Sequence, residues 1–143
     1  MKTLKNRPRI GYFCSYIPCQ ALERMGFEMV PIWKQELSSS ATKGCLSHNL
    51  CSFVRYCQKI LPKLSLDGII VANCCNSMQR LYDYCRVSFP GAFCAMLELP
   101  RDNTSVGYRF YNDSVRKLMA DLRHFFPGRP EAPAGNCTPE HPV

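Results

Sequence analysis

Two cysteines stand where this chain could carry out metal or redox chemistry, because each lies where a helix is expected to begin. Cys51 lies within residues 46–55 and Cys75 within residues 71–83. The first turn of a helix has unpaired N–H groups and the positive end of the helix dipole, which lower a thiol pKa and favour the thiolate. The thiolate is the form of cysteine that binds metals, so these positions indicate a site for a metal ion or an iron–sulfur cluster.

The elements that would position these cysteines alternate between short apolar runs and segments of helical periodicity. This alternation is typical of a parallel sheet covered by helices. Gly68–Ala72 is the clearest buried strand, because it is continuous and β-branched. We therefore expect an α/β fold: a three-layer, Rossmann-like, four-stranded parallel sheet with helices on both faces. The strands are predicted over residues 9–14, 28–32, 68–72 and 92–97, and the last helix is expected to end near Phe125.

Local signals predict the helix boundaries and the domain organisation. Ser15 is expected to cap the first helix and Asn76 or Ser77 the third, and Pro62 is expected to end or bend the second. Residues 1–126 should form one α/β domain. Residues 127–143 are rich in Pro and Gly and lack periodicity, so they are predicted to be a disordered tail.

Composition and charge limit the classes of partner that the chain could bind. The chain has 143 residues, is 46% hydrophobic and 20% charged, and carries a formal charge of +7. That charge would suit nucleic acid, an anionic membrane surface or a phosphate-bearing small molecule. Aromatic residues are not interleaved with a basic stripe, so no nucleic-acid partner is expected. No apolar run approaches the length of about 20 residues that a membrane span needs, so we expect a cytoplasmic protein without a membrane partner.

Most of the other cysteines, and the histidines, are expected to have no role in chemistry. The ten cysteines do not form a loop framework of the kind seen in disulfide-rich scaffolds and are expected to be reduced thiols. Cys14 belongs with Cys51 and Cys75 at the carboxyl edge of the sheet, where ligands collect in open parallel sheets. No compact metal, phosphate-loop or hydrolase motif is present, so a site would be assembled from separate loops. Cys57, Cys85 and Cys94 are expected to be small buried hydrophobes, and His48, His124 and His141 to be solvated or structurally satisfied.

Several short segments match, in order and spacing, those of the 2-hydroxyacyl-CoA dehydratase and benzoyl-CoA reductase family. The chain resembles the subunits of that family that carry an iron–sulfur cluster. The resemblance runs from about Arg9 to Phe126. Two positions depart from the family pattern: Cys19 stands where an acidic residue is typical, and Asn76 where Asp is typical. The matching segments are residues 11–18, 49–55, 67–71, 73–76, 80–83 and 97–101.

The resemblance implies that Cys51 and Cys75 ligate a 4Fe-4S cluster, with Cys74 as a possible substitute for Cys75. The family's third ligand lies in a second domain, and this chain is expected to correspond to the N-terminal half. The complete enzyme would be a lyase of anaerobic metabolism that removes water from an (R)-2-hydroxyacyl-CoA through a ketyl radical. No further catalytic residue is assigned, and the isolated chain is expected to be inactive.

The resemblance also implies partners. These are a sister dehydratase subunit or the missing second domain, an ATP-hydrolysing activator protein that delivers one electron, and a CoA thioester substrate. Arg55 and Arg80 are candidates for contacts with the phosphates of coenzyme A, although exposed arginines are usually solvated.

Three alternatives to the dehydratase hypothesis stay open. The chain could belong to a related CoA-thioester reductase, it could be a non-catalytic remnant or assembly module with the same fold, or it could be an unrelated nucleotide- or flavin-binding domain. Anaerobic expression separates most of them. A brown protein favours a cluster-bearing enzyme, a colourless soluble protein favours the non-catalytic module, and a bound flavin favours the third alternative.

Overall fold

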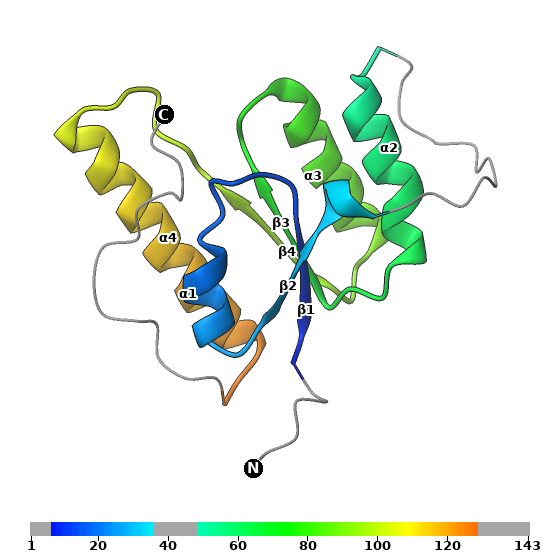
Figure 1. Cartoon of the computed structure of the whole chain (residues 1–143), viewed down its shortest axis with the longest axis horizontal. Helices are drawn as coiled ribbons and strands as arrows, with labels where there is room; N and C mark the ends of the chain where they lie inside the picture. The colour runs from blue at the N-terminus through cyan, green and yellow to red at the C-terminus, as the bar shows by residue number, and fades with distance from the viewer. Residues whose placement is uncertain (1–6, 36–48, 129–143) are drawn as a thin grey trace.

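A computed structural model describes residues 7–35 and 49–128 of the chain, and its helices and strands alternate as the sequence predicts (Figure 1). Short 3-10 turns follow β2 and α2, at Ile32–Lys34 and Leu61–Lys63. The main elements in chain order are β1 (Arg9–Tyr12), α1 (Cys19–Arg24), β2 (Glu28–Pro31), α2 (Ser52–Ile60), β3 (Gly68–Ala72), α3 (Asn76–Ser88), β4 (Phe93–Leu97) and α4 (Ser105–Phe125).

The four strands form one parallel sheet in the order β2-β1-β3-β4. Gly11 pairs with Val30 on one side and with Ile69 on the other, so β1 is central. The predicted four-stranded parallel sheet is confirmed. In this order the chain continues from β1 toward β2 on one side and returns to β3 on the other. The gap between the ends of β1 and β3 is therefore a topological switch point, the place where ligands bind in sheets of this class.

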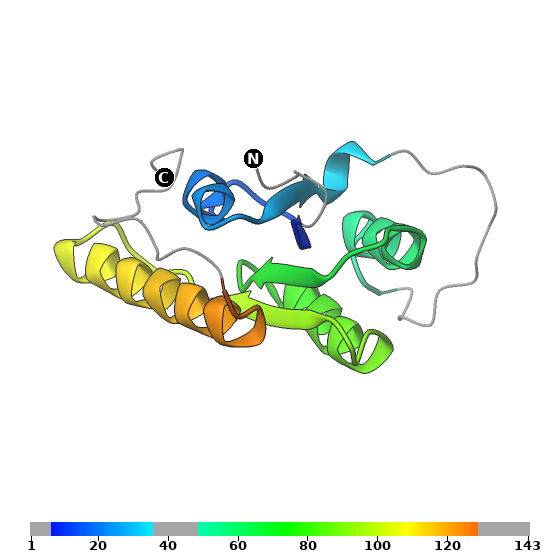
Figure 2. The ribbon, with the colours of Figure 1, turned by 90° about the horizontal axis from the view of Figure 1, so that it is seen from below.

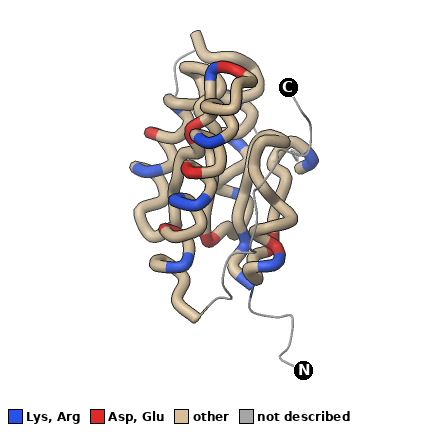
Figure 3. Tube along the Cα trace, turned by 90° about the vertical axis from the view of Figure 1, so that its left-hand side faces the viewer, with Lys and Arg blue, Asp and Glu red and all other residues tan. Residues whose placement is uncertain are grey.

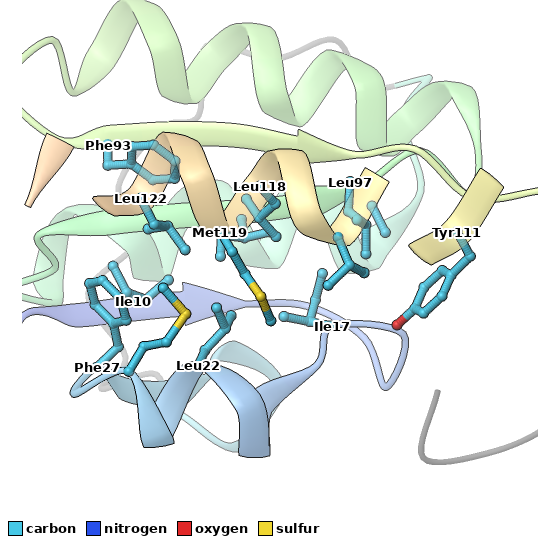
Figure 4. Packing of buried hydrophobic residues seen from close by; sticks show 14 residues of the cluster. Ile10, Ile17, Leu22, Phe27, Phe93, Leu97, Tyr111, Leu118, Met119 and Leu122 are labelled. Carbon is cyan, nitrogen blue, oxygen red and sulfur yellow. The ribbon is translucent and has the colours of Figure 1, made fainter. Parts of the chain in front are cut away.

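Helices cover both faces of the sheet, which confirms the three-layer architecture. Figure 2 shows α1 and α4 on one side of the strands and α2 and α3 on the other. Strand β3 serves both cores because its side chains alternate: Ile70 and Ala72 pack with α1 and α4, whereas Ile69 and Val71 pack with α2 and α3. Figure 4 shows the first of these cores.

The predicted N-cap residues are wrong at both helices for which they were named, α1 and α3. Helix α1 begins at Cys19 with Pro18 as its N-cap and no side-chain cap, because Ser15 lies within the turn that follows β1. Cys75 itself is the N-cap of α3, so Asn76 and Ser77 are already helical.

The predicted end of β1 is wrong by two residues, whereas the predicted end of α2 is confirmed. Strand β1 ends at Tyr12, two residues before the predicted end. The expected effect of Pro62 is confirmed, since α2 ends at Ile60 and Pro62 lies in the 3-10 turn that follows.

Some predictions lie outside the described residues. These are the disordered tail beyond Gly128, His48 and His141. The single-domain boundary at residue 126 stays a prediction. Among the helices that the structure describes, none is long and apolar enough to cross a bilayer.

Two thiols belong to the core between the sheet and helices α2 and α3. Cys57 and Cys85 are fully buried, as expected, whereas Cys94 is only partly buried because β4 is an edge strand. Burial disfavours the charged thiolate and raises the pKa of Cys57 to about 12, with a smaller contribution from Cys51. Burial also raises the pKa of Cys85. Both groups are therefore packed as neutral thiols.

These buried thiols predict a loss of stability at alkaline pH. Between the ordinary thiol pKa of 9.0 and the folded value of about 12, Cys57 ionises in the unfolded chain but not in the folded one. The free energy of unfolding should therefore fall above pH 9, and Cys57 should contribute up to about 1.4 kcal/mol per pH unit. Chemical denaturation between pH 8 and 10.5 should give a shallower slope for Cys57→Ala than for the parent. Ile60→Val, a thiol-free core change on the same helix, should keep the parent slope, and equal slopes in Cys57→Ala and the parent would contradict the assignment.

Candidate functional site

The candidate site lies at the edge of the sheet where the strands end and the helices begin. Figure 1 shows that all four helices start at this edge. Cys14 follows β1, Cys74 and Cys75 follow β3, and Cys51 precedes α2. The sequence therefore placed Cys14, Cys51 and Cys75 at the correct edge, and Cys14 and Cys75 flank the switch point between β1 and β3.

Cys51 and Cys75 are the N-cap residues of α2 and α3. Both have extended backbones, both are exposed, and neither side chain accepts a capping hydrogen bond from its helix. Their carbonyls start the helices instead: each accepts the backbone N–H of the residue four positions later, Arg55 or Gln79, at 3.2 Å. The backbone of each cysteine is thus held by a helix, while its sulfur stays accessible to a ligand.

A second group of thiols gathers at the switch point itself. The Cys74 thiol interacts with both Cys75 and Cys14, and these neighbours add to the effect of partial burial in raising the pKa of Cys74. Burial also raises the pKa of Cys14, although the backbone N–H groups of Tyr16 and Ile17 hydrogen-bond its sulfur and act in the opposite direction. The pairing of β1 with β3 explains this meeting of residues 60 positions apart, because it aligns the two strand ends.

The structure brings these thiols to one edge of the sheet but does not form a complete metal site among the described residues. Helices α2 and α3 pack against each other, so Cys51 and Cys75 begin neighbouring helices. Within residues 7–35 and 49–128, however, no group of three or more His, Cys, Asp or Glu side chains is placed to hold a metal ion. The described thiols can therefore provide only part of a ligand set.

Asn73, to which the sequence reading gave no role of its own, ties the cysteine loop to the loop after β4. Asn73 donates its backbone N–H to the carbonyl of Leu97 at 3.1 Å, and its side-chain Oδ1 accepts the N–H of Leu99 at 2.8 Å. Leu99 lines a cavity of about 180 Å³ beside this loop. Two signals in the sequence could have singled Asn73 out: its place directly after a buried strand and before two cysteines, and its presence in the family-matching segment 73–76.

The basic candidates and the histidine lie on the surface. Arg55 is exposed in the first turn of α2, and Arg80 is exposed and forms an ion pair with Asp83 at 3.7 Å. His124 is exposed near the end of α4, as expected for a solvated histidine. No described contact links these side chains to the cysteine loops, so a role for Arg55 and Arg80 in binding coenzyme A stays a prediction.

The fold and this edge define a class: a parallel α/β protein with thiol-bearing loops on both sides of its switch point. Comparison with known families gives a specific result, because the family described as 2-hydroxyglutaryl-CoA dehydratase, D-component, matches residues 14–131. The match covers most of the chain, and the chain belongs to this family. None of the curated proteins matches the sequence.

The two classes of cysteine should differ in reactivity. Brief alkylation of the native protein with iodoacetamide at pH 8, read by peptide mass spectrometry, should label the exposed Cys51, Cys74 and Cys75. Cys57 and Cys85 should be labelled only after unfolding, because burial excludes the reagent and keeps both as thiols. Labelling of Cys57 at the rate of Cys51 in the native protein would contradict the described packing.

Proposed function

We propose that this chain, as a 2-hydroxyacyl-CoA dehydratase component, uses Cys51 and Cys75 as thiolate ligands of a 4Fe-4S cluster. The observation that carries the proposal is that both cysteines are exposed N-caps of neighbouring helices at the ligand edge of the sheet. Iron–sulfur clusters are held by cysteine thiolates, and an exposed N-cap leaves the sulfur accessible to iron.

The thiols at this edge are the right kind of ligand for a 4Fe-4S cluster, but there are too few of them to complete its ligand set. Sulfur is the donor that a cluster requires, and at least two accessible sulfurs begin helices here. The remaining ligands would come from a partner component, which membership of the dehydratase family implies. Cys74 and Cys14 are the nearest thiols that could exchange with Cys75, because both interact within the same group.

When bound, such a cluster supplies one-electron chemistry and an iron that can act as a Lewis acid toward a substrate oxygen. The protein's own contribution is positional. The N-cap carbonyls of Cys51 and Cys75 fix the two backbones at the helix starts, and the hydrogen bonds of Asn73 hold the loop after β3 against the loop after β4. These constraints limit how far the sulfurs can move relative to the sheet.

The proposed reaction is the removal of water from a 2-hydroxyacyl-CoA, with an ATP-dependent activator as the source of the electron and a sister subunit or second domain completing the cleft. Family membership supports the dehydratase component, and the thiol-bearing edge supports the cluster. We also propose a cytoplasmic location, which suits reduced, oxygen-sensitive thiols.

Anaerobic reconstitution with iron and sulfide tests the ligand assignment. The parent protein should acquire broad visible absorption together with bound iron and sulfide. Cys51→Ser and Cys75→Ser should each lose most of the bound iron, because a hydroxyl is a poor ligand for iron in a cluster.

Matched controls are available in the core. Cys57→Ala and Cys85→Ala also remove one sulfur each, but from buried positions on α2 and α3, and should retain iron at the parent level. Circular dichroism of each variant checks that the fold is kept. Iron retention in Cys51→Ser equal to that of the parent would refute the assignment, and a folded parent that stays colourless would favour a non-catalytic module.

A further inference from the structure

The outer edge of β4 is the strongest feature that the proposed function leaves unassigned. Strand β4 (Phe93–Leu97) pairs with β3 on one side, and no described strand pairs with it on the other. A groove of about 440 Å³ follows this edge. Tyr82 lines the groove from α3, and Ser114, Lys117 and Asp121 line it from α4. Figure 2 shows β4 at the end of the sheet, with these two helices on either side of it.

The backbone of β4 offers hydrogen-bonding groups to this groove. Phe93 donates its N–H to the segment 67–73 that contains β3, at 2.9 Å, and Leu97 accepts an N–H from the same segment at 3.1 Å. Successive residues of a strand direct their backbone groups to opposite sides. Cys94 and Met96 therefore direct both N–H and C=O outward, where no strand of the described part of the chain pairs with them.

The two edges of the sheet differ in how they are protected against pairing. Proteins usually protect an edge strand with charged residues or proline, and the sequence of β4, Phe-Cys-Ala-Met-Leu, contains neither. The opposite edge strand, β2, begins with the exposed Glu28 and ends with Pro31, which has no N–H to donate. The edge at β2 is therefore protected, whereas the edge at β4 is open to a further strand.

Exposed apolar side chains extend this surface along α4. Val106 and Phe110 are 71% and 43% exposed. They belong to a row of residues that recurs every three or four positions and continues through Ser114, Lys117 and Asp121. The row therefore follows one side of the helix, the side that borders the groove. Exposed apolar residues beside an open strand edge are typical of a protein interface.

The two ends of the β4 edge carry opposite charges on the side of α3. Burial raises the pKa of Cys94, and the nearby Arg86 guanidinium acts in the opposite direction. Arg86 also lies over the ring of Tyr82, 5.7 Å from its centroid. Glu98 is exposed directly after the strand, and the alternation of side chains places it on the same face as Cys94. A positive charge thus lies near the start of the edge and a negative charge at its end.

The formal charge of +7 does not oppose contact between two copies at this surface. Figure 3 shows basic and acidic residues intermixed on the side of α1 and α4, so this side has no field of a single sign over its described residues. At the β4 edge itself, Arg86 and Lys117 are balanced by Glu98 and Asp121. A two-fold interface brings a surface against itself, and this balance makes the surface self-complementary.

We propose that the β4 edge binds the β4 edge of a second copy of this chain, antiparallel and about a two-fold axis at Ala95. Cys94 of each copy exchanges two backbone hydrogen bonds with Met96 of the other, and the two sheets become one. Ala95 faces its own copy in the closely spaced, non-hydrogen-bonded position, where a small side chain fits. Glu98 of each copy comes to the end of the edge where Arg86 of the other copy lies.

This arrangement leaves the thiol edge of each copy free. In an antiparallel pair the carboxyl ends of the two sheets point in opposite directions, so Cys51 and Cys75 of the two copies lie at opposite ends of the dimer. The second copy therefore does not complete the ligand set of the first. The inference is independent of the cluster assignment, because no group of the β4 edge belongs to the proposed ligands.

Light scattering and hydrogen exchange on the full chain test the inference without iron. In reducing buffer, the mass from size-exclusion chromatography with light scattering should rise with concentration from 16.3 kDa toward twice that value. In NMR spectra, exchange of the Cys94 and Met96 amides should slow as the dimer forms, because their N–H groups become paired. The amides of Ala95 and Leu97 are turned toward β3, so they are internal controls and should be protected at every concentration.

Charge reversals identify the contacts. Glu98→Arg and Arg86→Glu should each raise the dissociation constant of the dimer about tenfold, because each places like charges across the interface. Combined in one chain, the two changes place opposite charges together again and should return the constant close to the parent value. Glu23→Arg reverses an equally exposed charge on α1 and should leave the constant unchanged. Circular dichroism checks that each variant is folded.

Three outcomes would overturn the inference. The first is a monomer at every concentration, and the second is a dimer that neither charge reversal weakens, because its interface would lie elsewhere. The third is a monomer in which the Cys94 and Met96 amides are protected, which would show that another segment of the same chain covers the edge. Failure of iron reconstitution leaves all of these measurements interpretable, and a monomer in turn leaves the cysteine assignment untouched.

Discussion

The parallel pairing of β1 with β3 is the constraint on which the rest of the site depends. Ile10, Gly11 and Tyr12 pair with residues 68–70, a separation of nearly 60 positions, and this register brings the ends of both strands to the same level. Two thiol-bearing loops then leave the sheet side by side, one with Cys14 and one with Cys74 and Cys75. Without that register, the interaction between Cys14 and Cys74 would have no structural basis.

Position in the fold decides the chemistry of each cysteine. Cys57 and Cys85 face the sheet from α2 and α3, where burial raises their pKa and keeps them neutral. Cys51 and Cys75 belong to the same two helices but lie at the N-caps, where the thiol is exposed. About two helical turns on α2 and three on α3 therefore separate a packing group from a candidate ligand, because the interior disfavours an anion whereas an N-cap leaves the thiol accessible.

Features that depend on local periodicity could be predicted from the sequence, and features that depend on loop geometry could not. The run Gly68–Ala72 is apolar throughout and β-branched at its three middle residues, so its place as an inner strand followed from composition. The helix caps failed because capping depends on backbone conformation as well as residue type. Ser15 has a suitable side chain but lies in a turn, whereas Thr104 lies at a helix start and does cap α4. The cavity escaped prediction because its walls join Tyr16 to residues of α4 more than 90 positions away.

The two halves of the site also differ in how complete they are. The cavity beside β4 is preformed, because Tyr111, Asp102, Thr104 and Gly107 fix its floor and rim through contacts within the chain. The thiol edge, by contrast, brings accessible sulfurs together without placing three donors around one point in the described residues. A preformed cavity loses little conformational entropy when it binds a small ligand, whereas an open ligand set becomes ordered only when further donors arrive. The step at this edge that needs a partner is therefore the completion of the thiol ligand set, because the cavity beside it is already fixed by contacts within the chain.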